Sequence, residues 1–148
     1  MSTWSDIVAD APAFADRLRT IFVAGTNKTL ATLRLDGSPR ISGTELEFDG
    51  PRITLGMMPN SRKLADVQRD ARVAIHSPTI EPPKGTLGLG DAKLSGVLVP
   101  IDPPSPESLD GLYFELDIHD AVVTWVENDL LIIESWTPGG GLKKASRT

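Results

Sequence analysis

Two Asp-Gly pairs, at positions 36–37 and 49–50, do most to limit what this chain can fold into. Each pair lies between segments in which apolar and polar residues alternate, which is the pattern of a strand with one buried face. Asp-Gly between two such segments is a strong short-range signal for a tight hairpin turn. Residues 29–57 are therefore predicted to form a three-stranded antiparallel meander.

The remainder of the chain continues the hairpin pattern. Apolar residues at helical spacing predict helices at 3–22, interrupted at Pro12, and at about 61–69, whereas the segment 78–90, rich in proline and glycine, is predicted to be a loop. Many short antiparallel strands in one small chain predict a single domain, 1–148, folded as a closed or half-closed β-barrel. The strands predicted after the meander are 71–77, 92–101, 113–126 and 129–136. A turn at Glu127-Asn128 is predicted to join the last two.

Charge and composition argue against several classes of function. The formal net charge is −5 and the sequence pI is about 4.9, which argues against non-specific binding to nucleic acid or to an anionic membrane. The chain has no cysteine and two histidines, His76 and His119, so no disulfide, thiol chemistry or protein-built metal site is expected. No apolar run approaches the roughly 20 residues of a membrane span, and the N-terminus lacks the features of a signal peptide. A cytoplasmic protein is therefore expected.

Two cations stand where a helix normally disfavours them. Arg62 and Lys63 fall in the first turn of the helix predicted at about 61–69, after Asn60 or Ser61 as the N-cap. A helix N-terminus carries a partial positive charge and spare N–H groups, so two added cations make an anion site, most naturally for phosphate. Arg40, on the neighbouring hairpin strand, would add a third charge. The alternative interpretation is that Arg62 and Lys63 are solvated surface charges.

Small residues lie on the strands next to the predicted anion site. Gly56 precedes the helix and permits close approach of a ligand to the backbone. Ser42, Gly43 and Thr44 give the neighbouring strand small side chains, and the two hydroxyls are suited to hydrogen-bonding the heteroatoms of a flat polar ring. The predicted site thus extends from a phosphate to a ring.

Three segments resemble one known family. "TLATLRLDGSPRISGTELEF", "ITLGMMPNSRKLADVQRDARVAIHS" and "LLIIESWTPGGG" are similar, in order and register, to the pyridoxamine 5′-phosphate oxidase-like family over about residues 27–147. This is the flavin-binding split-barrel group, whose actinobacterial branch includes enzymes that use the deazaflavin F420. The resemblance implies a mainly β fold, a six-stranded antiparallel split β-barrel with short flanking helices. It also implies a homodimer with two cofactor sites at the subunit interface.

The resemblance assigns roles to particular residues. In the family, a Ser-Arg-Lys segment at a helix start and an arginine on the second strand hold the cofactor phosphate, and the backbone one strand over lies along the cofactor ring. A tryptophan near the C-terminus, often from the second subunit, lines the site, and Trp136 matches it. The residues that match the phosphate and ring positions are Ser61, Arg62, Lys63, Arg40, Gly56, Met57 and Met58.

The chain also departs from the oxidases that give the family its name. Glu45 stands where those enzymes carry a lysine, and their C-terminal arginine and histidine substrate signature is missing. Oxidation of pyridoxamine 5′-phosphate itself is therefore not implied. The "WTPGG" ending looks more like the actinobacterial branch. The basic tail, 137–148, is either a floppy end or a segment that folds over a site, where Lys143, Lys144 and Arg147 would contact an acidic cofactor tail.

No acid–base pair or nucleophile stands out in the sequence, as expected where a bound cofactor carries the chemistry. We therefore predict an oxidoreductase that uses FMN or F420 to move a hydride to or from a small organic substrate. One alternative is a non-enzymatic protein of the same fold that binds flavin, F420 or haem, with His76 as the only sensible haem ligand. Another is a degenerate barrel that serves as a dimeric scaffold.

Overall fold

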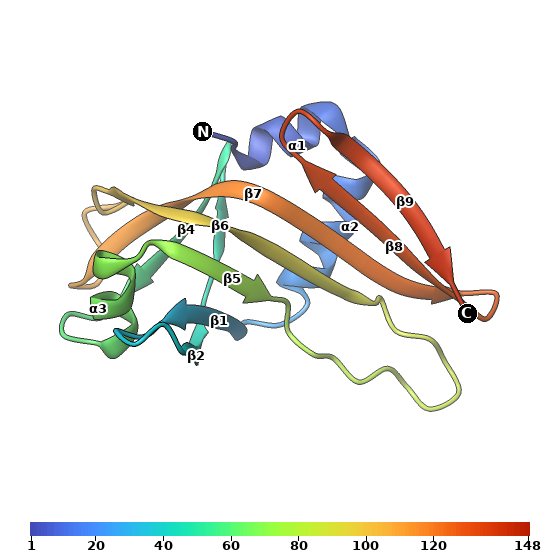
Figure 1. Cartoon of the computed structure of the whole chain (residues 1–148), viewed down its shortest axis with the longest axis horizontal. Helices are drawn as coiled ribbons and strands as arrows, with labels where there is room; N and C mark the ends of the chain where they lie inside the picture. Colours follow the sequence, from blue (N-terminus) through green and yellow to red (C-terminus); the bar gives the residue numbers. More distant parts are fainter.

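Nine strands and three short helices make up the fold in the computed structural model, which describes residues 1–148 (Figure 1). The helices are α1 (Trp4–Asp10), α2 (Pro12–Val23) and α3 (Arg62–Arg69). None of them is long and apolar enough to cross a membrane. The strands are β1 (Lys28–Leu33), β2 (Pro39–Thr44), β3 (Glu47–Asp49), β4 (Arg52–Met57), β5 (Arg72–His76), β6 (Asp91–Ile101), β7 (Leu112–Glu127), β8 (Leu130–Thr137) and β9 (Gly141–Arg147).

The sheet closes on itself through β2 and β3. Its strands run in the order β2-β1-β5-β6-β7-β4-β3, and every neighbouring pair is antiparallel. The first and last strands of that order are consecutive in the chain, with only Glu45 and Leu46 between them. If β2 and β3 are counted as one interrupted strand, it forms a six-stranded barrel with β1, β5, β6, β7 and β4. This confirms the predicted antiparallel split barrel. No ladder joins β2 to β4, so the barrel is open between these two strands.

The predicted hairpins are present, with one break in the meander. β1 pairs with β2 around Asp36-Gly37, and β3 pairs with β4 around Asp49-Gly50. Both glycines have positive φ values, 84° and 58°, which glycine adopts at little cost. The last hairpin, β7–β8, turns at Asn128-Asp129, one residue later than predicted. The break at Glu45 and Leu46 was not predicted; it places Leu46, which is 7% exposed, in the core.

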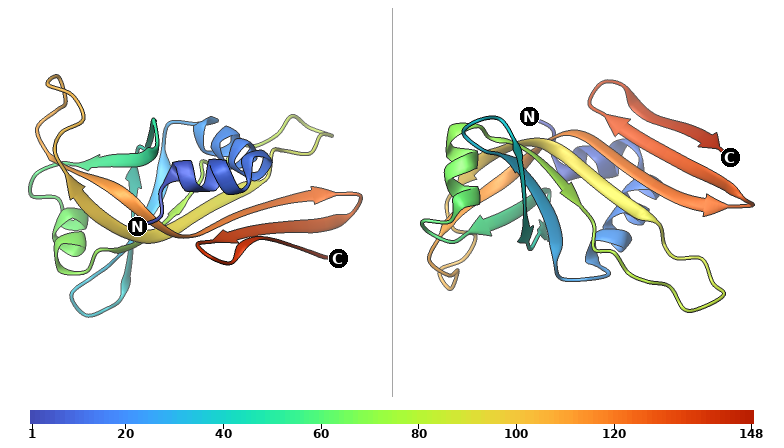
Figure 2. Two further views of the ribbon diagram at one scale, coloured as in Figure 1. Left: turned by 90° about the horizontal axis from the view of Figure 1, so that it is seen from above. Right: turned by 60° about the horizontal axis from the view of Figure 1, so that its bottom comes forward.

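Helices α1 and α2 pack against β4, β6 and β7 and complete the core (Figure 2). Pro12 is the first residue of α2, so the expected interruption of the N-terminal helix is confirmed. Pro suits this position because its missing N–H is one of the unpaired donors of a helix start. The buried residues of the two helices recur at helical spacing and join a single core cluster; they are Trp4, Ile7, Phe14, Ala15, Leu18, Ile21 and Phe22.

The basic C-terminal segment is a strand. Residues Gly141–Arg147 form β9, which pairs along β8 from Thr137 opposite Gly141 to Leu131 opposite Arg147. The segment is therefore not a floppy end. Figure 1 shows that β8 and β9 lie beside the end of β7 that is remote from α3. Lys143 and Lys144 are exposed there, so the predicted contact between the tail and a cofactor bound near α3 is not made within one chain.

Candidate functional site

The start of α3 has the predicted capping arrangement. Ser61 is the N-cap, and its side-chain oxygen accepts a hydrogen bond from the Leu64 N–H at 3.3 Å. Asn60 precedes it in the left-handed region, with a φ of 65°, a conformation that asparagine tolerates better than most residues. Arg62 and Lys63 are then the first two helical residues. Of the two caps that the sequence allowed, Asn60 and Ser61, the structure has Ser61, and the helix begins next to the predicted position.

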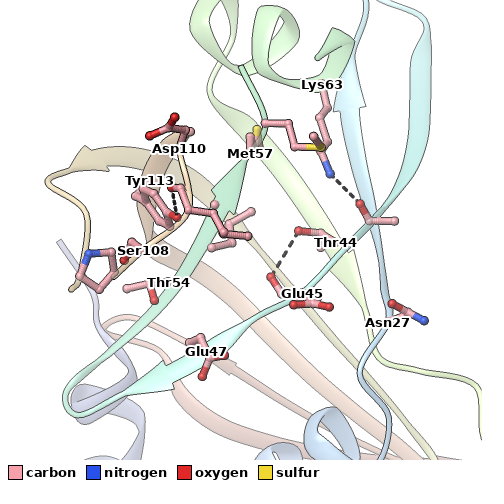
Figure 3. Close-up of a pocket in the computed structure, with 17 residues that line it drawn as sticks. Asn27, Thr44, Glu45, Glu47, Thr54, Met57, Lys63, Ser108, Asp110 and Tyr113 are labelled. Carbon is pink, nitrogen blue, oxygen red and sulfur yellow. Dashed lines mark hydrogen bonds between the residues drawn. The ribbon is translucent and has the colours of Figure 1, made fainter. Parts of the chain in front are cut away.

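A cleft of about 590 Å³ lies where the barrel is open between β2 and β4 (Figure 3). Its walls come from the end of β2, from β3 and β4, from the first turn of α3 and from the segment 104–113. The cleft thus joins segments that are far apart in the sequence. Five of the predicted site residues line it: Thr44, Gly56, Met57, Met58 and Lys63.

Lys63 is a half-buried cation at the rim of the cleft. Its Nζ donates to the carbonyl oxygen of Gly43 at 2.7 Å, which ties α3 to β2, and it forms no salt bridge with a carboxylate. Burial lowers the pKa of Lys63 below its ordinary value. Two of its three N–H donors have no protein partner. A desolvated, unpaired ammonium with free donors is suited to binding an anion.

Glycine at two positions shapes the cleft. A Cβ at Gly56 would lie 2.7 Å from the ring of Tyr113, which stands beside it on β7, so a side chain at this position would displace the ring. A Cβ at Gly43 would meet nothing within 4 Å, which leaves open space beside the backbone at the end of β2. Met58 is 75% exposed at the rim. The cleft is therefore open, with a tyrosine ring as one wall.

Arg40 does not line the cleft but is held by a buried carboxylate. Its Nε donates to Asp66 Oδ2 at 2.8 Å, and the same carboxylate accepts from Thr32 Oγ1 at 2.7 Å and from Arg69 Nη2 at 3.1 Å. The Asp66 side chain is 4% exposed. Burial alone would raise the pKa of Asp66, but the hydrogen bonds from Arg40, Thr32 and Arg69 outweigh it and lower the pKa. The other guanidinium donors of Arg40 have no protein partner.

Ser42 carries the one fully buried side-chain polar atom without a hydrogen-bond partner, its Oγ. Arg40, Ser42 and Thr44 alternate along β2, so their side chains share one face of the strand. Thr44 on that face lines the cleft, and its Oγ1 donates only a long bond, 3.3 Å, to the Glu45 carbonyl. Ser42 therefore lies between the anchored Arg40 and the cleft.

Three other candidates lie outside the cleft. Arg62 is exposed and forms no salt bridge. Trp136 is 3% exposed, belongs to the core cluster, and donates from Nε1 to Asp10 Oδ2 at 2.7 Å, so within one chain its ring packs against α1 and does not reach the cleft. His76 is half-buried, with Nδ1 2.7 Å from the Ser77 carbonyl oxygen, and is absent from the lining of the cleft.

Several lining residues were missed by sequence reasoning. Tyr113, Glu45, Glu47 and the segment 102–111 were not among the residues predicted to form the site. Whether such residues line the cleft depends on how the strands are aligned: Tyr113 on β7 reaches the cleft because it pairs with Gly56 on β4. The alternation in "YFEL" does place Tyr113 and Glu115 on one face, but no local signal says which face that is. The missed lining residues include Glu45, Glu47, Thr54, Ser108, Asp110 and Tyr113.

Comparison with known proteins establishes the fold. No family model and no curated protein matches the sequence. Among solved structures, PhzG from Burkholderia lata 383, in complex with tetrahydrophenazine-1-carboxylic acid, is similar with a TM-score of 0.64 and 14% identity, over 93% of this chain and 87% of that chain. A protein named F420 reductase has a TM-score of 0.52 and 15% identity, over 70% of this chain and 94% of that chain.

A third structure, of a heme binding protein from Mycobacterium smegmatis, has a TM-score of 0.54 and 20% identity, over 91% of this chain and 57% of that chain. At these identities the likeness concerns the fold alone. The chain thus shares an antiparallel split-barrel fold with these structures.

Proposed function

We propose that the protein binds FMN or F420 in the cleft between β2 and β4 and transfers a hydride between that cofactor and a small organic substrate. The observation that carries the proposal is Lys63, a half-buried ammonium at the rim of the 590 Å³ cleft with no carboxylate partner. Solved structures of this fold include proteins named for F420 reduction and for heme binding, and one in complex with an organic heterocycle.

The groups around Lys63 fit a phosphate. A phosphate accepts several hydrogen bonds, and donors without protein partners are present at the Nζ of Lys63, the free guanidinium nitrogens of Arg40 and the buried Oγ of Ser42. Asp66 fixes Arg40 without using all of its donors. We therefore assign phosphate binding to Lys63, the one of these three side chains that lines the cleft, with Ser61 acting as the cap that starts α3.

The remaining residues of the cleft have a simpler task. The bound flavin or deazaflavin supplies the hydride acceptor or donor. The backbone of Gly56, Met57 and Met58 provides a surface for a flat ring, and Thr44 provides a hydroxyl beside it. The segment 104–113, with the Tyr113 ring packed beside Gly56, forms a further wall of the cleft. The chain itself therefore binds, orients and shields the reactants.

We also propose that the protein works as a homodimer. Met58 and Leu109 line the cleft yet are 75% and 84% exposed, and Ile41 on β2 is 74% exposed. Apolar side chains gathered at the rim of an open cleft are suited to being covered by a second copy. Sedimentation equilibrium should give twice the mass of the 15.9 kDa chain, whereas a monomer at micromolar concentration would contradict the proposal.

The test of the function has two steps. The purified chain is titrated with FMN and, separately, with F420, and binding is followed by fluorescence. The complex with the reduced cofactor is then mixed anaerobically with a panel of organic acceptors, and reoxidation is followed by absorbance. We expect one cofactor to bind at micromolar concentration or tighter and to be reoxidised. Tight binding without reoxidation by any acceptor would indicate a carrier, and failure of both cofactors to bind would refute the assignment.

A further inference from the structure

The segment 102–111 joins β6 to β7 and forms part of the wall of the cleft without contributing to the core. It supplies Ser108, Leu109 and Asp110, among others, to the lining, and none of its residues is buried. Figure 2 shows it as the loop that projects beyond the ends of β6 and β7. A segment with few buried contacts opens locally at little cost in free energy. Core packing therefore does not fix the position of this wall.

Most hydrogen bonds of the segment are internal. The Ser108 N–H donates to the Ser105 carbonyl oxygen at 3.0 Å, and the Glu107 N–H donates to Ser105 Oγ at 3.2 Å. These bonds close a turn, but they would persist if the whole segment moved. Outside the strand ladders, one hydrogen bond joins the segment to the barrel. The Tyr113 hydroxyl on β7 donates to the carbonyl oxygen of Leu109 at 2.6 Å (Figure 3).

Tyr113 itself has a fixed place on the barrel. It lies on β7 in register with Gly56 on β4, and its ring packs so closely there that a Cβ at Gly56 would lie 2.7 Å from it. The position of the ring sets the position of the hydroxyl, and hence that of Leu109. Because the acceptor is a main-chain oxygen, the Leu109 side chain, 84% exposed, stays free for the contact with a second copy proposed above.

We propose that Tyr113 is a positioning residue whose hydroxyl holds the segment 102–111 in place as a preformed wall of the cleft. A wall that is ordered before a ligand arrives spares the free energy of ordering it on binding. The tether starts from β7, whereas Lys63 is hydrogen-bonded to the Gly43 carbonyl on β2, so the tether and the phosphate site act separately. The consequence for cofactor binding rests on the proposed function, but the order of the segment does not.

The test compares the isotope-labelled full chain with Tyr113→Phe, which removes the hydroxyl and keeps the ring. The matched control is Thr20→Val, because the Thr20 hydroxyl on α2 also donates to a carbonyl four residues earlier, that of Asp16 at 2.8 Å, and lies outside the cleft. Backbone order at the Ser108 and Leu109 amides is measured by NMR relaxation without ligand. The affinities of each protein for the cofactor that binds, FMN or F420, and for its phosphate-free form are then measured.

We expect an order parameter near the rigid value of about 0.85 at Leu109 in the wild type and the control, and a value of about 0.6 or less in Tyr113→Phe. Loss of one neutral hydrogen bond should weaken binding of both forms of the cofactor by a similar factor, about 2- to 10-fold. The preference for the phosphorylated form should persist, because Lys63 is unchanged.

Four results would each overturn the proposal: equal order of the segment in the wild type and Tyr113→Phe, an equal loss of order in Thr20→Val, unchanged affinity for both forms of the cofactor, or a loss confined to the phosphorylated form. If neither FMN nor F420 binds the wild type, the proposed function fails. The relaxation data on the ligand-free protein still decide whether Tyr113 holds the wall, so the two failures are distinguishable.

Discussion

Replacing Asp66 by alanine is expected to remove about 3–5 kcal/mol of the free energy of unfolding. The Asp66 carboxylate is 4% exposed and accepts bonds from Arg40 at 2.8 Å, Thr32 at 2.7 Å and Arg69 at 3.1 Å. It joins α3 to β1 and β2, on the wall of the barrel beside the cleft. Its removal leaves the Arg40 side chain, 19% exposed, without a counter-charge, and removal of one partner of a buried pair has a cost of that size.

The magnitude is large because small domains are only marginally stable, by about 5–15 kcal/mol in total. Summing the three lost hydrogen bonds separately would give a similar or larger figure, but part of it is recovered when a carboxylate no longer has to be buried. The matched control is Asp49→Ala, which removes the ion pair with Arg52 at 3.2 Å between side chains that are 48% and 33% exposed. Exposed pairs contribute about 0–1 kcal/mol.

Urea denaturation of the cofactor-free protein measures both variants, with the slope on denaturant checked for constancy. The pH dependence gives a second readout. Because the folded-state pKa of Asp66 is lowered, its stabilisation is complete above the unfolded-state pKa of about 3.9 and is lost as the pH falls through the folded-state pKa. Asp66→Asn should therefore lose less stability in acid than the wild type. A loss in Asp66→Ala no larger than in Asp49→Ala would refute the reasoning.

Three further perturbations test other parts of the structure. Trp136→Phe removes the hydrogen bond from the indole N–H to Asp10 at 2.7 Å. Because Asp10 is exposed, the free energy of unfolding measured in urea should fall by about 1 kcal/mol. An unchanged denaturation midpoint would show that the bond contributes nothing. Gly96→Ala, at the bulge in β6, would drive a Cβ into a backbone carbonyl of β7 and should cost about 2–3 kcal/mol, seen as a lower melting temperature. The hydrogen bonds from Arg72 lower the pKa of Asp70 to about 2, and NMR titration should show that value return toward 3.8 in Arg72→Ala.

The barrel was predictable because its main signals are local. Alternation along β1 and β2, and along β3 and β4, together with the Asp-Gly pairs between them, specifies two hairpins without reference to distant residues. The break at Glu45 and Leu46 was not predictable, since alternation continues through it. β9 was missed for the opposite reason: "GLKKASR" has no apolar alternation, and its pairing depends on β8 and on the turn before Gly141.

In the candidate site, too, some features follow from local sequence and others depend on contacts between distant residues. The cap at Ser61 and the place of Lys63 follow from a few neighbouring residues, and the structure brings Lys63 to the cleft. Arg40 was expected at the phosphate, but its bond to Asp66, 26 positions away in the sequence, is a tertiary contact that no local pattern shows. Tyr113 and Thr54 enter the cleft through strand register alone. Trp136 was expected to line the site, but its ring is buried in the core of its own chain.

The central claim is that the Lys63 end of the cleft holds a cofactor phosphate. The most direct measurement compares the affinities for FMN and for riboflavin, the same flavin without its phosphate. The proteins are the wild type, Lys63→Ala and, as the control, Lys84→Ala, which changes an exposed lysine of the 78–90 loop. If F420 is the form that binds, its phosphate-free chromophore replaces riboflavin. A charge-assisted hydrogen bond contributes about 1.5–3 kcal/mol, so the wild type and Lys84→Ala should prefer the phosphorylated form by roughly 10- to 150-fold, and Lys63→Ala should lose most of that preference. Equal affinity for both forms in the wild type, or an undiminished preference in Lys63→Ala, would contradict the account.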